Sequence, residues 1–179
     1  MKGQNLLIAT FSVWREKKRT AINGMVEPLL TFFFPEFETI DLIDGAHPGD
    51  EETRTRFEYY QNKKLKKTDF AWISFLLSPF LKLQNTNGTQ IVFKLRDFLS
   101  VLELSIRKRK RYDLFIGLES VFTLSGIVLK KLGVVKTVVY YVSDYAPNRY
   151  SQKLLNNIYL WLDRTCCYYA DFIWDVSPA

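Results

Sequence analysis

The segment Thr137–Val142 (TVVYYV) constrains the fold most strongly, because it is apolar on both faces. A strand of this kind is typical of the centre of a parallel sheet that helices cover on both sides. Strand and helix patterns alternate along much of the chain, which is the order expected of a parallel α/β domain. The other expected strands are Asn5–Phe11, Phe37–Ile43, Tyr112–Leu118 and Asp171–Ser177.

Apolar residues at helical spacing predict the helices between these strands. The first helix begins near Met25 and stops at Pro35, and a later one ends at Gly133, which suits the left-handed position after a helix. Two apolar stripes are expected to face the core. They are Ile91, Val92, Leu95, Phe98, Leu99, Leu102 and Ile106 in one helix, and Leu154, Leu155, Ile158, Leu162 and Cys166 in the last.

The middle of the chain has a different pattern. Thr53–Tyr60 alternates as a strand does, and Gln61–Lys64 suits the turn of a hairpin. Phe70–Gln84 fits either a strand or a short helix. The fold class expected for residues 1–179 is therefore one Rossmann-like, doubly wound α/β domain, with a mainly parallel sheet, helices on both faces and an extra β-hairpin.

Composition leaves several partners open. The chain has 179 residues and a formal net charge of +6, which suits anionic lipid, phosphorylated ligands or nucleic acid. Its two cysteines, Cys166 and Cys167, are adjacent, so no disulfide framework is expected and a reducing cytoplasm is favoured. The longest apolar stretch, Phe70–Leu83, is too short and too interrupted to span a bilayer.

Familiar catalytic motifs are missing from the sequence. It has no GxGxxG after the first strand and no GxxxxGK[ST], which disfavours a Rossmann dehydrogenase and a P-loop enzyme. No RRM, KH, zinc-finger or clear helix-turn-helix signature is present, so nucleic acid is a disfavoured partner. The single histidine, His47, gives little support to a histidine-based metal site or a Ser-His-Asp triad.

Three segments carry a resemblance to a known family. They are YDLFIGLES (Tyr112–Ser120), VVYYVSDYAPNRY (Val138–Tyr150) and NNIYLWLDRTCCYYADFIWDVSPA (Asn156–Ala179). In order and spacing they resemble the acceptor-side domain of family-4-type glycosyltransferases of the GT-B fold. Thr53–Gln84 departs from that pattern, as does Asp144, where many retaining members have a histidine.

The resemblance implies that residues 1–179 are the N-terminal half of a retaining glycosyltransferase that makes glycans or lipid-linked glycans. The partners it implies are a sugar or lipid-linked acceptor and a C-terminal domain, absent from this chain, that binds the nucleotide-sugar donor. No cofactor is expected in the chain itself, which would then be inactive alone. The expected location is cytoplasmic, peripheral to the membrane.

Ligands of doubly wound sheets bind beyond the carboxyl ends of the strands. The loops that begin at Phe11, Asp44, Leu118 and Ser143 are therefore the expected site. The candidate acceptor-binding residues in and near these loops are Arg15, Lys17, Gly24, His47, Glu119 and Arg149, with Asp144 as the candidate catalytic base.

Each candidate has an alternative interpretation. Arg15 and Lys17, with Lys18 and Arg19, either bind phosphate or belong to a solvated loop. Gly24 either lets an anion approach a helix start or is an ordinary loop glycine. His47 either touches an acceptor hydroxyl or lies in a plain loop.

Carboxylates such as Glu119 can accept hydrogen bonds from two sugar hydroxyls, whereas Asp144 also suits the N-cap of the next helix. The basic run Arg107, Lys108, Arg109, Lys110 and Arg111 suits an anionic membrane surface, and equally the C-terminus of a helix. Together with Lys63–Lys67, this run supports an alternative function, a non-catalytic binding module for membrane or nucleic acid.

Overall fold

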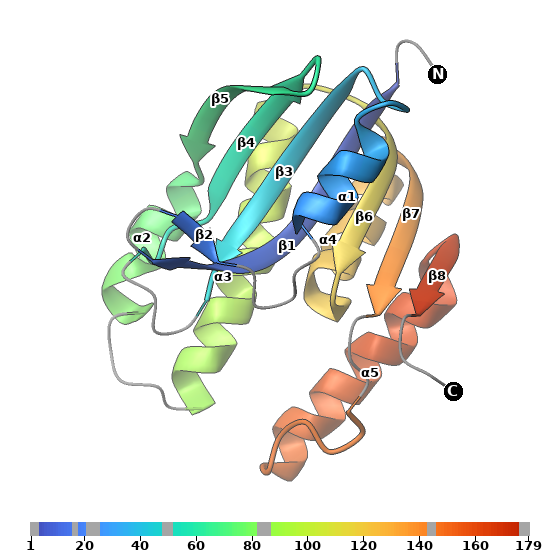
Figure 1. Ribbon diagram of the computed structural model, residues 1–179. Helices are drawn as coiled ribbons and strands as arrows, with labels where there is room; N and C mark the ends of the chain where they lie inside the picture. Colours follow the sequence, from blue (N-terminus) through green and yellow to red (C-terminus); the bar gives the residue numbers. More distant parts are fainter. Residues whose placement is uncertain are drawn as a thin grey trace.

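The chain folds into an α/β domain around one twisted sheet (Figure 1). The computed structural model describes residues 4–15, 18–20, 26–47, 52–81, 87–142 and 146–175. Along the sheet the strand order is β5-β4-β3-β1-β6-β7-β8, and β2 pairs with β1 outside this path. The strands from β3 to β8 in this order are parallel, whereas β4 and β5 are antiparallel to their neighbours.

The bounds of the elements follow the expected alternation. The strands are β1 (Asn5–Arg15), β2 (Lys18–Thr20), β3 (Thr39–Ala46), β4 (Arg56–Gln61), β5 (Lys64–Phe70), β6 (Tyr112–Leu118), β7 (Val135–Val142) and β8 (Phe172–Asp175). The helices are α1 (Val26–Phe33), α2 (Trp72–Leu81), α3 (Asn87–Arg107), α4 (Ser120–Lys131) and α5 (Lys153–Tyr169).

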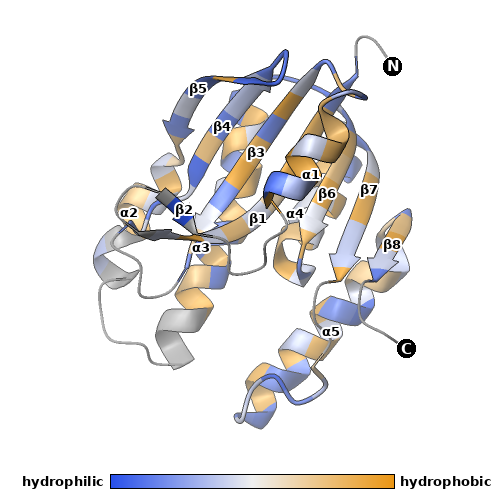
Figure 2. Cartoon of the chain, viewed as in Figure 1, coloured by the Kyte–Doolittle hydropathy of each residue, from blue (hydrophilic) through white to orange (hydrophobic). Residues whose placement is uncertain are grey.

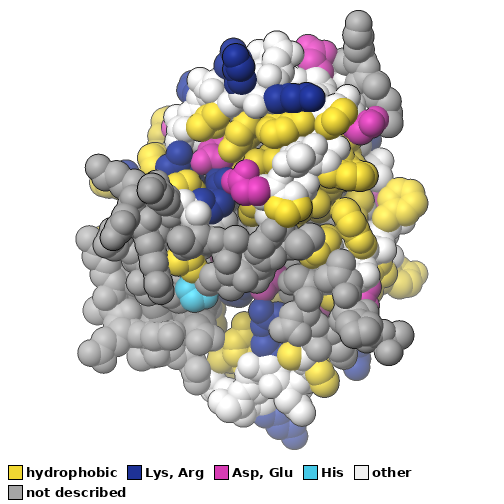
Figure 3. Space-filling model, viewed as in Figure 1, with side chains coloured by type: hydrophobic (Ala, Val, Ile, Leu, Met, Phe, Trp, Pro, Cys, Tyr) yellow, Lys and Arg dark blue, Asp and Glu magenta, His cyan; other side chains and the backbone are white. Residues whose placement is uncertain are grey.

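Helices cover both faces of the sheet, unequally. Figure 1 shows α1 in front of the sheet and α3 and α4 behind it. Alternate residues of β1 divide between the two cores: Leu6 and Ile8 pack towards α1, and Leu7 and Ala9 pack towards α3 and α4. The predicted doubly wound α/β fold is confirmed. On the side of α1, hydrophobic side chains still reach the surface (Figure 3).

The chain reverses its direction of winding between β1 and β6. From β1 it crosses through α1 to β3 on one side, and from β6 it crosses through α4 to β7 on the other. Such a switch point leaves a crevice at the carboxyl ends of the strands, where ligands bind in open α/β sheets. Figure 1 shows the N-terminal halves of α3 and α5 extending past this edge.

Two strands are longer than predicted. The segment after Phe11, expected to be a loop, continues β1 to Arg15 and turns back as β2, with Val13 opposite Thr20. Asp44 was expected in a loop but lies within β3, opposite Thr10 of β1. In both cases neighbouring strands supply partners for the backbone, so polar side chains do not end the strand.

The predicted hairpin in the middle of the chain is confirmed. Asn62 and Lys63 form its turn with φ of 52° and 62°, as a two-residue type I′ connection requires. Phe70 closes β5, and the helical alternative is correct for the next segment, which forms α2. β5 is the edge of the sheet, and Figure 2 shows hydrophilic colouring along most of it.

The predicted core stripe of α3 is only partly correct. Ile91, Leu95 and Ile106 are about half exposed, and the helix instead buries a face that includes Phe93 and Val101. That face also holds Arg96, whose guanidinium donates to the carbonyls of Ala46 (2.7 Å) and Thr53 (2.9 Å). The stripe of α5 fails in the same way at Leu154 and Ile158, which are exposed.

The length and hydropathy of a helix decide whether it could cross a membrane. In the described part of the chain, no helix is both long and apolar enough to cross a membrane. Cys166 packs as expected: it is buried in α5 and donates to the carbonyl of Ser120 (3.1 Å), and burial raises the pKa of its thiol to about 12. Cys167 is exposed.

Candidate binding site

The junction between β6 and α4 forms the centre of the candidate site. β6 ends at Leu118 and α4 begins at Ser120, so Glu119 alone connects strand and helix. This tight passage requires Gly117, because a Cβ atom there would lie 2.6 Å from the backbone nitrogen of Thr123. The hydroxyl of Thr123 donates to the carbonyl of Gly117 (3.0 Å), which fixes the first turn of α4 against the strand.

Glu119 adopts a strained backbone conformation. Its φ of 72° and ψ of 162° lie in a region that is essentially restricted to glycine. A non-glycine residue there costs roughly 1–3 kcal/mol, and such residues cluster at functional sites. The strained backbone therefore makes the side chain of Glu119 a candidate for a functional role.

Two cations hold the carboxylate of Glu119. Lys94 of α3 donates to Oε2 (2.8 Å) and Arg149 donates to Oε1 (2.7 Å). The backbone on both sides of Arg149 is held by Asn156 of α5, which donates to the carbonyl of Pro147 (2.8 Å) and accepts from the backbone N–H of Tyr150 (3.2 Å). We refer to Lys94, Glu119 and Arg149 as the edge cluster.

The edge cluster keeps its charges near neutral pH. Burial acts to raise the pKa of Glu119, but the charges of Lys94 and Arg149 outweigh it and hold that pKa below its usual range. Burial acts to lower the pKa of Lys94, but Glu119 and Asp97 outweigh it and raise that pKa. Two positive charges and one negative charge therefore meet at this edge, and Glu119 is a poor proton acceptor near pH 7.

Aromatic rings extend the site towards β1 and β3. The ammonium of Lys94 lies 5.6 Å from the centroid of the Phe11 ring, within cation–π range. Phe11 in turn stacks on Phe122 of α4, with centroids 6.5 Å apart, and lies 6.0 Å from the ring of His47. His47, directly after β3, thus reaches the same edge as Glu119.

A pocket of about 270 Å³ opens beside the edge cluster. All three residues of the cluster line it, and α3, α4 and α5 form its walls. Most of those walls are apolar, including Leu95, Leu124 and Ile158. Small-molecule sites usually combine a largely apolar cavity with a few convergent polar groups, as here.

Of the residues predicted from the sequence, the structure pairs Glu119 with Arg149 and places His47 at the same edge, next to Phe11. Lys17, Gly24 and Asp144 lie outside the described residues, as does the side chain of Arg15. Lys94 was missed. The sequence could have indicated it. Lys94 follows Ile91 by three residues and precedes Phe98 by four, so this charged residue lies on the helix face that was expected to be core.

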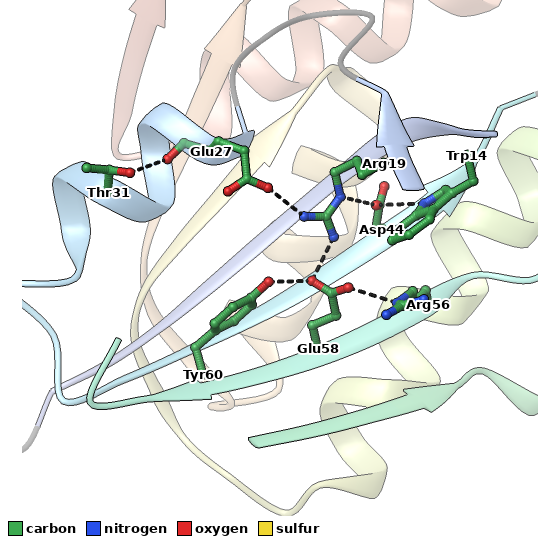
Figure 4. Close-up of polar contacts among 8 residues, drawn as sticks. All are labelled: Trp14, Arg19, Glu27, Thr31, Asp44, Arg56, Glu58 and Tyr60. Carbon is green, nitrogen blue, oxygen red and sulfur yellow. Dashed lines mark hydrogen bonds and ion pairs between the residues drawn. The ribbon is translucent and has the colours of Figure 1, made fainter. Parts of the chain in front are cut away.

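Arg19, expected as a phosphate ligand, is occupied within the fold (Figure 4). Its guanidinium pairs with Asp44 of β3 (3.0 Å), Glu58 of β4 (2.7 Å) and Glu27 of α1 (3.2 Å). The indole of Trp14 also donates to Asp44 (3.1 Å). Arg19 therefore fastens the β1–β2 hairpin to three other elements and is not free to bind a ligand.

Asp44 is the most deeply buried carboxylate of this network. Burial outweighs the charge of Arg19 and raises the pKa of Asp44 to about 6. Glu58 is shared further, with Tyr60 donating to Oε2 (2.6 Å) and Arg56 lying 2.8 Å from Oε1 (Figure 4).

The basic run after α3 is also largely paired within the domain. Arg107 and Lys108 bind Asp69 at 3.2 and 2.9 Å, and Lys110 binds Asp41 at 3.2 Å. Arg109 and Arg111 are exposed. Ion pairs within the domain account for three of these residues, and the use of the run at a membrane surface stays a prediction.

Among the described residues, no cluster of three or more His, Cys, Asp or Glu side chains is arranged to hold a metal ion. A scan against models of known protein families found no match for this chain, and neither did a search of curated proteins.

Proposed function

We propose that this chain is the acceptor-binding half of a GT-B glycosyltransferase, in which a second domain binds the nucleotide-sugar donor. The observation that supports it best is the edge cluster, a charged carboxylate between two cations, beside a pocket at the switch point of a doubly wound sheet. Ligands of open α/β sheets bind at such points. The sequence resemblance to family-4-type enzymes points in the same direction.

The chemistry of the edge cluster suits a sugar. Each carboxylate oxygen of Glu119 accepts one hydrogen bond from a cation and has a second lone pair for a sugar hydroxyl. Lys94 and Arg149 can donate to the hydroxyl oxygens. Because the pKa of Glu119 is held low, its role would be to orient the acceptor, and proton removal would belong to another group, for which Asp144 stays the prediction.

Ligand-observed NMR on the chain tests this proposal, with a panel of short glycans and nucleotide-sugars as probes. We expect binding of glycans without binding of nucleotide-sugars. Glu119→Gln should weaken glycan binding by roughly tenfold or more, because a charged acceptor contributes roughly 1.5–3 kcal/mol to a hydrogen bond. Glu36→Gln, on an exposed turn, is the matched control and should leave binding unchanged. Tight nucleotide-sugar binding by this chain alone would refute the proposed division of labour.

An anionic membrane surface is a second candidate partner, favoured by α2. This helix turns Trp72, Phe75 and Leu76 to solvent and buries Ser74, the reverse of the usual arrangement. Arg107 stacks on Trp72 at 4.7 Å, which places the start of the basic run beside these apolar side chains.

Cosedimentation with phosphatidylcholine vesicles, with and without phosphatidylglycerol, tests this second partner. We expect binding only with the anionic lipid, and loss of binding in Phe75→Asp but not in Phe32→Asp, an exposed phenylalanine on α1. Equal binding by the two variants would show that α2 is not the membrane-binding element.

A further inference from the structure

The apolar residues that α3 and α5 fail to bury face a shared space. Ile91 and Leu95 of α3 are 51% and 49% exposed, and Ile158 of α5 is 45% exposed. All three line the pocket beside the edge cluster. α3 and α5 each pack against α4, and the pocket lies between them. The stripes that the sequence assigned to the core thus supply much of a cavity wall.

The lining of the pocket is divided by polarity. Its charged side chains are gathered in one group, because Lys94 and Arg149 both bind Glu119. Tyr159, which also lines the pocket, lies against Arg149, with the guanidinium 5.4 Å from its ring. Apart from Ser120 and Tyr150, the remaining wall consists of apolar side chains, which offer a ligand no hydrogen bonds; they include Leu95, Phe98, Leu124 and Ile158.

We propose that this pocket binds the hydrocarbon chain of an amphiphilic ligand whose polar head lies on the edge cluster. A nucleobase is a poorer fit, because its ring edge would leave donors and acceptors unpaired against the aliphatic wall. Identifying the head as a sugar rests on the proposed function; the ligand is then an acceptor carried on a lipid chain.

The size of the pocket limits the length of chain that it takes. Its volume of about 270 Å³ lies just below the range of roughly 300–1,000 Å³ that is usual for whole small-molecule ligands. The pocket therefore holds one segment of a single chain, and the rest of the ligand extends outside.

A series of alkyl glucosides with increasing chain length, each below its critical micelle concentration, tests this inference by isothermal titration calorimetry. Each buried methylene contributes about 0.8 kcal/mol, so affinity should rise about fourfold per methylene until the pocket is full and then level off. Octyl phosphate, measured beside octyl glucoside, shows whether the edge cluster prefers an anionic head.

Variants of the pocket wall distinguish binding within the pocket from general hydrophobic adsorption. Leu95→Asn and Ile158→Asn alter half-exposed side chains, so the fold should survive, which thermal unfolding can check. Both should abolish the dependence on chain length, whereas Leu132→Asn, an exposed leucine at the other end of α4, should not.

The outcomes distinguish this inference from the proposed function. Affinity that is independent of chain length, or a slope that both wall variants retain, would overturn the inference even if short glycans bind at Glu119. A clear slope that Leu95→Asn removes, without any binding of glycans, would support the pocket and refute the sugar acceptor.

Discussion

At the scale of single residues, Glu119 combines two features that folded proteins usually avoid. Its backbone has a conformation suited to glycine, and its carboxylate is nearly buried. Ion pairs with Lys94 and Arg149 offset the cost of burying the carboxylate. The strained backbone conformation brings no contact of its own that would offset its cost. The strain follows from the one-residue passage between β6 and α4, which places the carboxylate at the edge of the sheet.

This strain predicts an inverted preference between alanine and glycine. Glu119→Gly should be more stable than Glu119→Ala by roughly 1–3 kcal/mol, because both lose the ion pairs but only glycine adopts a φ of 72° without strain. Urea unfolding measures the difference. At Asn157, an exposed position within α5, the same pair should show the ordinary order, with alanine ahead by about 1 kcal/mol.

Asp44 predicts a dependence of stability on pH. Its pKa is raised from 3.8 to about 6 by burial, so between these values the folded state holds a proton that the unfolded state has released. The stabilisation from this group is complete below the lower value and is lost as pH rises through the upper one.

Asp44→Asn isolates this contribution. The unfolding free energy of the wild type, minus that of the variant, should fall as pH rises from about 4 to about 6, by at most about 1.4 kcal/mol per pH unit. Denaturant titrations across this range measure it. A difference that grows with pH would mean that the charge of Arg19 outweighs burial.

At the scale of elements, Gly117 determines how α4 meets the sheet. Gly117→Ala should cost up to about 3 kcal/mol and also weaken ligand binding, because the added methyl group meets the backbone of Thr123 and displaces the helix start beside Glu119. Gly133→Ala is the control, with a φ of 71° and open space around it. It should cost about 1–2 kcal/mol and leave binding intact, as urea unfolding and NMR titration would show.

The elements also show what sequence patterns can predict. Apolar strands such as β6 and β7 were located correctly, because their burial depends on their own side chains. The face that α3 buries was not, because burial of Arg96 depends on bonds to carbonyls 43 and 50 residues away in sequence, as well as on its pairing with Asp97. Polar residues that find distant partners leave no local signal, and the displaced apolar stripe then lines the pocket.

The topology rule, by contrast, located two of the three residues of the edge cluster. Glu119 and Arg149 were predicted from the position of strand ends alone, and they meet at the edge of the sheet. Lys94 completes the cluster from a helix, and no rule about strand ends includes it.

At the scale of the whole molecule, the edge of the sheet at β5 accounts for a second basic cluster. Lys64, Lys66 and Lys67 are exposed on this outer strand. Lysines on an edge strand oppose pairing with the sheet of another molecule. This role explains them without a nucleic-acid partner.

Replacing these three lysines by threonine should promote self-association, because the exposed backbone of β5 loses the charges that repel a second copy. Light scattering after size-exclusion chromatography measures the mass of the species formed. Threonine at Lys131, Lys153 and Arg164, exposed on helices, removes the same charge and should leave the mass unchanged. Association in both triple variants would point to net charge and not to the strand edge.

The network around Arg19 has a consequence for sequence divergence. One guanidinium serves carboxylates from α1, β3 and β4, two of which are buried. A substitution at Arg19 alone takes the cation away from Asp44, whereas Glu58 keeps its ion pair with Arg56, so Asp44 must become neutral in the same lineage. Homologues should therefore inherit Arg19 and Asp44 together, either both charged or both neutral, while surrounding residues drift independently.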